Sequence, residues 1–89
     1  MREAQVTVKN KVGLHARPAA TFVQEATKFK SKINIECGGR KADGKSILQV
    51  LSLGVKCGSL IVIRADGEDE DEAVEKLVYM IEAGLGEEV

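Results

Sequence analysis

The sequence predicts an α+β fold in which helices cover one face of an antiparallel sheet, with the element order β-α-β-β-α-β-α. Apolar and polar residues alternate in several short segments, which is typical of half-buried strands. Between these segments, apolar residues recur at helical spacing. Glycine and aspartate turn signals separate the elements. Because each alternating strand has one polar face, we expect all helices on the opposite face.

The first strand is expected at residues 4–8, where Ala4, Val6 and Val8 alternate with polar residues. A break follows at residues 10–13. The next segment has the apolar stripe of a helix. Its members are Ala19, Phe22, Val23, Ala26 and Phe29.

A second alternating strand follows at residues 33–37. The pair Gly38-Gly39 is a strong hairpin signal and leads into a short strand at residues 40–42. Residues 43–45, Asp-Gly-Lys, then turn the chain again. These two strands are therefore expected to be antiparallel neighbours.

A short helix is expected at residues 46–53, with Gly54 as its C-terminal stop. The most hydrophobic strand, residues 60–65, should be central in the sheet. Acidic residues 68–72 lead the final helix, where negative charge suits the N-terminal dipole, and Gly84 ends it. Its expected buried stripe consists of Ala73, Val74, Leu77, Met80 and Ile81.

Length and composition exclude several classes of protein. With 89 residues, 44% hydrophobic and 30% charged, the chain is expected to fold as one globular domain spanning residues 1–89. It has no Trp, one Tyr and two Phe, so it offers few of the stacking platforms that single-strand nucleic-acid binders use. Apolar runs such as residues 60–63 are far short of the ~18 residues of a membrane span. Without a signal peptide at its N-terminus, the protein is expected to be cytoplasmic.

The cysteine and histidine content argues against a metal or cofactor. Cys37 and Cys57 lack the spacing of a redox or metal motif, so we expect two separate reduced thiols. His15 is the only histidine, and no ligand set surrounds it in the sequence. No metal and no cofactor are therefore expected.

Charge is unevenly distributed along the chain. Residues 1–57 contain 11 Lys and Arg against four Asp and Glu, whereas residues 58–89 contain two against ten. If the basic part forms one surface, the partners that approach His15 should be acidic there. The alternative is that folding mixes the two parts on one surface. The sequence leaves both open.

The segment around His15 combines features of an anion site. Pro18 fits the first turn of a helix, which places His15 at the helix start. The backbone N–H groups of Ala16 and Arg17 then point towards an anion beside the imidazole. Gly13 permits the tight turn that precedes it.

These residue types suit phosphoryl transfer. A neutral imidazole is a good nucleophile near neutral pH, since its ordinary pKa is about 6.5. Arg17 offers a forked donor that matches phosphate oxygens, and phosphoryl transfer mostly requires positioning and charge stabilisation. A lone histidine at a helix start is, however, usually a cap or an inert surface residue. No Walker loop is present, so nothing indicates that the chain activates a nucleotide.

The segment 13–19, Gly-Leu-His-Ala-Arg-Pro-Ala, resembles the active-site signature of the histidine-containing phosphocarrier (HPr) family. This family belongs to the bacterial phosphoenolpyruvate-dependent sugar phosphotransferase system. Residues 45–54 and 65–70 agree at the family's spacing, and the resemblance covers nearly the whole chain. It implies an open-faced β-sandwich, a four-stranded antiparallel sheet with three helices on one face.

The resemblance also implies a role for each site residue. Phosphorylated enzyme I would give its phosphoryl group to Nδ1 of His15, and the group would then pass to a sugar-specific enzyme IIA. Arg17 matches the arginine that assists transfer. A carrier that docks its partners in succession is expected to be monomeric. The matching docking positions are Ala20, Ile47, Leu48, Leu51 and Gly54.

Ser46 matches a regulatory serine of many Gram-positive relatives. The partners implied there are HPr kinase/phosphorylase and a catabolite-control transcription regulator. A phosphate would add about −1.5 to −2 charge beside Ile47 and Leu48 and repel an acidic partner. Ser46 and Gln49 also form the pattern of a capping box, so we expect Ser46 to cap the helix. Two positions depart from the family: Val12 replaces a polar residue, and Gln49 replaces a small one.

Two other functions stay open at this point. A non-catalytic regulatory module would bind a transcription factor or metabolic enzyme and use His15 only as a contact. A regulatory branch of the family lacks the histidine, so the presence of His15 argues against that branch. A metabolite-binding domain is disfavoured because no polar cluster suggests a pocket. The leading hypothesis is a carrier that is a substrate of two enzymes, not an autonomous enzyme.

Overall fold

The structure is a computed structural model that describes residues 1–86. Within these residues, the predicted element order β-α-β-β-α-β-α is confirmed. The elements are β1 (Arg2–Thr7), α1 (Ala16–Ala26), β2 (Lys32–Cys37), β3 (Arg40–Asp43), α2 (Ile47–Ser52), β4 (Leu60–Asp66) and α3 (Glu70–Glu82).

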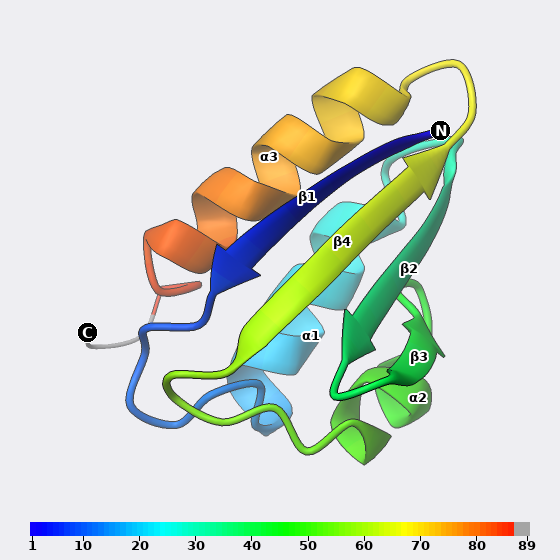
Figure 1. The fold of residues 1–89 in the computed structure, drawn as a ribbon. Helices are drawn as coiled ribbons and strands as arrows, with labels where there is room; N and C mark the ends of the chain where they lie inside the picture. The colour runs from blue at the N-terminus through cyan, green and yellow to red at the C-terminus, as the bar shows by residue number, and fades with distance from the viewer. Residues whose placement is uncertain (87–89) are drawn as a thin grey trace.

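The four strands form one antiparallel sheet in the order β1-β4-β2-β3. The hydrophobic strand β4 is central, as its composition predicts, and Ile63 lies between Ala4 of β1 and Ile35 of β2. Gly38 and Gly39 form the two-residue turn that joins β2 to β3. All three helices lie on one face of the sheet, and the other face is open (Figure 1). The expected open-faced β-sandwich is thus confirmed.

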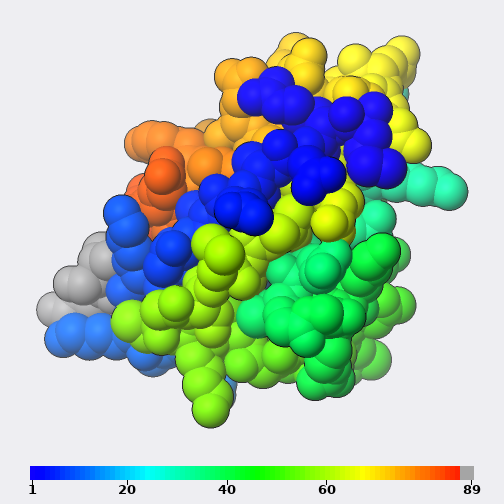
Figure 2. Space-filling model, in the orientation of Figure 1, coloured from blue at the N-terminus to red at the C-terminus, as the bar shows by residue number. Residues whose placement is uncertain are grey.

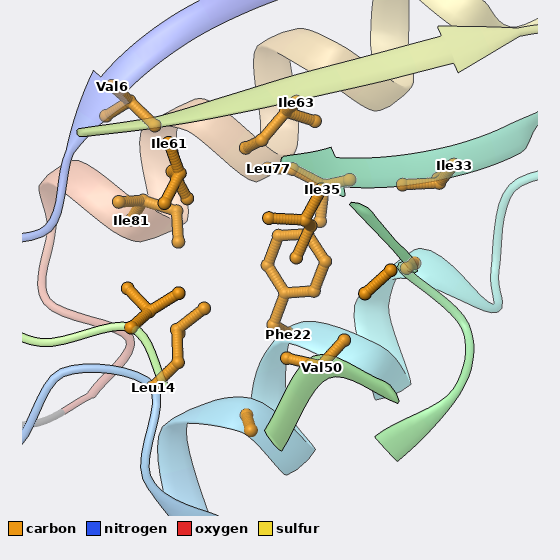
Figure 3. Packing of buried hydrophobic residues seen from close by; sticks show 14 of the residues in the cluster. Val6, Leu14, Phe22, Ile33, Ile35, Val50, Ile61, Ile63, Leu77 and Ile81 are labelled. Atoms are coloured by element: carbon orange, nitrogen blue, oxygen red, sulfur yellow. The ribbon is translucent and has the colours of Figure 1, made fainter. Parts of the chain in front are cut away.

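The core is aliphatic apart from one aromatic ring. Phe22 of α1 is fully buried and lies between Ile35 of β2 and Val50 of α2 (Figure 3). Leu77 of α3 belongs to the same buried cluster. Leu14 also belongs to it, although it precedes α1 and lies outside any helix or strand. The backbone immediately before His15 is therefore anchored in the core.

The first helix is shorter than its apolar stripe. It ends at Ala26, and Phe29 lies in the turn that follows, where its N–H donates to the carbonyl of Ala26 at 3.2 Å. The Phe29 side chain still packs against the core. The Lys45 ammonium donates to the Phe29 carbonyl at 2.7 Å. Phe29 therefore contributes to the core from the turn that follows α1 and not from the helix itself.

Ser46 caps α2, but the expected capping box is only half formed. Its Oγ accepts from the N–H of Gln49 at 3.3 Å, as predicted. The reciprocal bond is absent among these groups, because the N–H of Ser46 already donates to the carbonyl of Asp43 at 3.0 Å. The Gln49 side chain instead accepts from the N–H of Asp43 at 2.9 Å. Ser46 and Gln49 are thus both hydrogen-bonded to Asp43, the last residue of β3.

Charges from the two parts of the sequence meet at the end of the molecule that carries the N-terminus. Figure 2 shows the dark blue N-terminal residues lying against the yellow and orange start of α3. The Met1 amine lies 3.2 Å from Glu70, and Arg2 lies 3.0 Å from Asp71. Basic groups of residues 1–57 and acidic groups of residues 58–89 therefore meet at this end, which is opposite to the start of α1 (Figure 1).

Candidate functional site

His15 is the N-cap residue of α1. Its backbone is extended, with φ −76° and ψ −174°, and its carbonyl accepts the first intrahelical bond from the N–H of Ala19 at 2.9 Å. The side chain is exposed and makes no capping hydrogen bond. The imidazole is therefore held at the helix start by its backbone alone and faces solvent.

The first turn of α1 provides an environment for an anion beside His15. Ala16 and Arg17 are exposed, and Pro18 has no N–H to donate. Because the first intrahelical donor is Ala19, the N–H groups of Ala16 and Arg17 precede the hydrogen-bonded part of the helix. They lie at the positive end of the helix dipole. The helix thus starts where the sequence predicts, directly after His15.

Position 13 requires glycine for two reasons: its backbone is left-handed, and it lies very close to the backbone of residues 55 and 56. Its φ is +62°, and a Cβ built on it would lie 2.3 Å from the carbonyl oxygen of Val55 and 2.7 Å from Cα of Lys56. The sequence indicates the turn, but it does not reveal the approach to the segment after α2. Any side chain at position 13 would push that segment away.

Asn10 lies in the loop before His15 and makes contacts that the sequence does not reveal. Its side-chain amide donates to the carbonyl of Gly13 at 2.6 Å, and its own carbonyl accepts from the N–H of Gly13 at 3.1 Å. The residue is 0% exposed although it lies in a loop. A single Asn in a polar break looks like any turn residue, so no sequence signal distinguishes it.

A hollow lies next to Arg17, between α1 and the end of α3. It has a volume of about 380 Å³ and is lined by Arg17 and Thr21 on one side and Tyr79 and Met80 on the other, with the turn after α3 at its end. The Thr21 hydroxyl donates to the carbonyl of Arg17 at 3.1 Å. Arg17, in the first turn of α1, thus lines a hollow that extends to the C-terminal end of α3.

The predicted docking residues lie on α1, on α2 and just after α2, and these helices pack against each other. Val50 points into the core, while Leu48 is 78% exposed and is the most exposed large apolar side chain of residues 1–86. Leu51 is also exposed. The remaining predicted positions are half-buried Ala20 and Ile47 and exposed Gly54.

Three further properties of residues 1–86 bear on the site. They contain no group of three or more His, Cys, Asp or Glu side chains arranged to hold a metal ion. Cys37 and Cys57 are free thiols. None of the helices in this part of the chain has the length and apolar character to cross a bilayer.

Comparison with known proteins gives consistent matches. Residues 2–83 match the family described as "PTS HPr component phosphorylation site". The HPr-like protein Crh of Halalkalibacterium halodurans is 52% identical over 82 residues, which are 92% of this chain and 98% of Crh. The phosphocarrier protein HPr of Haemophilus influenzae is 44% identical over 80 residues, 90% of this chain and 92% of that protein.

Two solved structures are similar to this chain in fold and in sequence. HPr-C-His from Thermoanaerobacter tengcongensis superimposes with a TM-score of 0.96, at 49% identity and with 100% of both chains covered. A structure described as an HPr dimer from the same organism gives a TM-score of 0.78 at 49% identity, covering 98% of this chain and 100% of that chain.

Proposed function

The chain belongs to the HPr family, and on that premise we propose that it carries a phosphoryl group on His15 between enzyme I and a sugar-specific enzyme IIA. The observation that carries the proposal is the exposed imidazole at the start of α1, which makes no capping hydrogen bond. In this role the chain is a substrate of both enzymes and not an autonomous enzyme.

The transfer is a displacement at phosphorus. The lone pair of neutral His15 Nδ1 attacks the phosphorus on enzyme I, a new N–P bond forms, and the bond between phosphorus and its donor atom on enzyme I breaks. The electron pair of the broken bond stays on that donor atom. In the second transfer, the acceptor atom of enzyme IIA attacks, the N–P bond at His15 breaks, and its electron pair returns to Nδ1.

The start of α1 stabilises the charge that the phosphoryl group brings. The N–H groups of Ala16 and Arg17 precede the first intrahelical bond, so they can donate to phosphate oxygens on Nδ1. The guanidinium of Arg17 adds a charged donor on the same turn. Such groups stabilise the transferring phosphoryl group in place, which is most of what this chemistry demands.

Docking is proposed for the α1–α2 surface. Exposed Leu48 and Leu51, with half-buried Ile47, give this surface an apolar centre. Exposed Lys11 lies in the loop that contains Gly13, and exposed Lys56 belongs to the segment that Gly13 approaches. An apolar centre with basic residues around it suits a partner whose surface is apolar at its centre and acidic at its rim.

A regulatory binding module is the second candidate. It is favoured by the 52% identity to a protein named Crh, which exceeds the 44% identity to a protein named HPr. The regulatory branch of the family lacks the histidine, whereas this chain has His15 within the full signature. The histidine therefore favours the carrier.

We further propose that Ser46 is a site of regulatory phosphorylation by an HPr kinase/phosphorylase, with a catabolite-control transcription regulator as a later partner. Ser46 is the N-cap of α2 and is half-exposed. A phosphate there would place negative charge beside Leu48 and oppose an acidic partner without removing the cap acceptor.

The carrier is proposed to be a monomer, and light scattering of the unphosphorylated and phosphorylated chain tests this.

The carrier is tested by complete transfer. The chain is incubated with enzyme I, labelled phosphoenolpyruvate and enzyme IIA, and label on each protein is followed in time. Label that appears first on this chain and then on enzyme IIA supports the carrier. Label that stops on enzyme I, with a known HPr as positive control, leaves the regulatory module as the better account.

A further inference from the structure

We propose that Asn10 is a positioning residue for phosphoryl transfer: it fixes the peptide unit between Gly13 and Leu14 and thereby sets how His15 is presented. The inference rests on the proposed carrier function of His15. It assigns a role in that reaction to a residue outside the Gly13–Ala19 signature.

The Gly13–Leu14 peptide unit is held at both ends. Its carbonyl oxygen, which belongs to Gly13, accepts from the Asn10 amide at 2.6 Å. Its N–H, which belongs to Leu14, donates to the carbonyl of Val55 at 3.1 Å. Because a peptide unit is planar, bonds at both ends fix the orientation of the whole plane. Releasing either bond lets the plane rotate about its flanking dihedrals.

The orientation of this plane is transmitted directly to His15. Leu14 is anchored in the core, and His15 follows it as the N-cap of α1. The dihedrals on either side of Leu14 therefore decide where the extended backbone of His15 begins. The imidazole has no capping hydrogen bond of its own, so its placement depends on this backbone.

The chemistry of the Asn10 side chain fits positioning better than simple stabilisation. Its hydrogen-bond partner is the carbonyl oxygen of Gly13, which can only accept. The amide nitrogen of Asn10 is therefore the donor. The other side-chain atom, Oδ1, is buried and has no hydrogen-bond partner among the described residues. A buried acceptor without a partner is unfavourable. The turn is already closed by the backbone bond from Gly13 to Asn10, so the side chain is not needed to close it.

Two variants test the role of the Asn10 side-chain amide as a hydrogen-bond donor. Asn10→Ala removes it, and Asn10→Asp replaces it with a carboxylate of nearly the same shape that only accepts when ionised. Each variant is predicted to lower kcat for phosphorylation by enzyme I about tenfold or more, because small misplacements of a reacting group have effects of this size. The KM for this chain should change less than twofold, because the docking residues on α2 are untouched.

The pH profile of Asn10→Asp separates positioning from stability. A protonated carboxyl donates again, so the ratio of variant to native kcat should rise towards one as the pH falls. Both proteins are measured at each pH under the same conditions, so effects of pH that do not depend on residue 10 are common to the two. A ratio that does not change with pH, at temperatures where both proteins are folded, contradicts the role of the donor.

Ser31→Ala is the matched control. Ser31 is also buried and bonded through its side chain, to Asp69, but it lies after α1 at the opposite end of that helix from His15. Its loss should reduce stability and leave kcat at the native value. Equal kcat for Asn10→Ala and Ser31→Ala overturns the inference.

A chemical donor distinguishes this inference from the function on which it rests. Phosphoramidate phosphorylates histidine without enzyme I, and the hydrolysis rate of phosphorylated His15 can then be compared between native protein and Asn10→Ala. We expect different rates, since the contacts of the phosphate with the Ala16 and Arg17 N–H groups depend on the placement of His15. Failure of enzyme I to act on the native chain contradicts the carrier alone, whereas equal hydrolysis rates contradict the role of Asn10.

Discussion

The N–H of Leu14 donates to the carbonyl oxygen of Val55 at 3.1 Å and joins the loop before His15 to the segment after α2. The two residues are far apart in the sequence, yet they place the start of α1 beside the end of α2 (Figure 1). This bond ties the segment that leads to the proposed phosphorylation site to the segment that follows the proposed docking helix. Changes at this contact are therefore expected to affect phosphorylation of His15.

Gly13→Ala should disrupt the contact between the loop before His15 and the segment after α2. The new Cβ would need a left-handed backbone and would lie 2.3 Å from the Val55 carbonyl oxygen, so we expect a loss of about 1–3 kcal/mol of unfolding free energy in urea. Phosphorylation should also slow. Gly38→Ala is the matched control, because its φ is +59° but no atom lies within 4 Å of the Cβ position. Equal losses for the two variants would show that the contact with Val55 is unimportant.

Substitutions at Ser46 should separate its two proposed roles. Ser46→Ala removes the acceptor for the Gln49 N–H and should cost about 1 kcal/mol of stability, with little effect on phosphorylation of His15. Ser46→Asp keeps an acceptor at the N-cap and adds a negative charge, so stability should be retained and phosphorylation by enzyme I should slow. Thermal unfolding and initial transfer rates measure the two effects. If Asp and Ala variants transfer equally fast, charge at this position does not regulate docking.

Leu48 is predicted to contribute to binding and not to folding. Because its side chain is 78% exposed, Leu48→Ala should change the unfolding free energy by less than about 0.5 kcal/mol. An apolar anchor at the centre of an interface should instead raise the KM of enzyme I for this chain by about tenfold. Leu60→Ala, at an exposed position on β4, is the control and should leave the KM unchanged. If the two variants have the same KM, Leu48 does not contribute to the docking of enzyme I.

The contact between Asp69 and Ser31 should govern stability in acid. A hydrogen bond from the Ser31 hydroxyl at 2.5 Å, followed by one from the Lys30 N–H at 2.8 Å, lowers the pKa of the Asp69 carboxyl from 3.8 to about 2. Since the folded pKa is the lower one, this contribution is fully present above pH 3.8 and is lost as the pH falls towards 2.

Urea unfolding of native protein and Asp69→Asn between pH 6 and about 2 measures that contribution. The difference in stability between the two proteins should be constant at the upper end and shrink through the acid range. A difference that is independent of pH would contradict the assigned pKa.

Local patterns in the sequence predicted most of the fold. Alternation placed the strands, and the hydrophobicity of residues 60–65 correctly placed β4 at the centre of the sheet. Ser46 was recognised as a cap because its partner, Gln49, lies only three residues away. Periodicity was less accurate where a turn can substitute for a helical turn, as at Phe29, which packs against the core from outside α1.

Contacts between distant segments were not predictable from these patterns. The helix start at His15 follows from Pro18 and the apolar stripe, but the approach of Gly13 to Val55 depends on how two loops pack. The burial of Asn10 has the same origin. The bonds from Asp69 to residues 30 and 31 likewise join segments that no local pattern relates.

The central claim is that His15 accepts the phosphoryl group, and the most direct measurement is intact mass after incubation with enzyme I and phosphoenolpyruvate. Native protein should gain the mass of one phosphoryl group, lose it on brief acid treatment and keep it in mild alkali, while His15→Ala gains nothing. An unmodified native protein beside an active enzyme I, or a modification that persists in acid or in His15→Ala, would contradict the account.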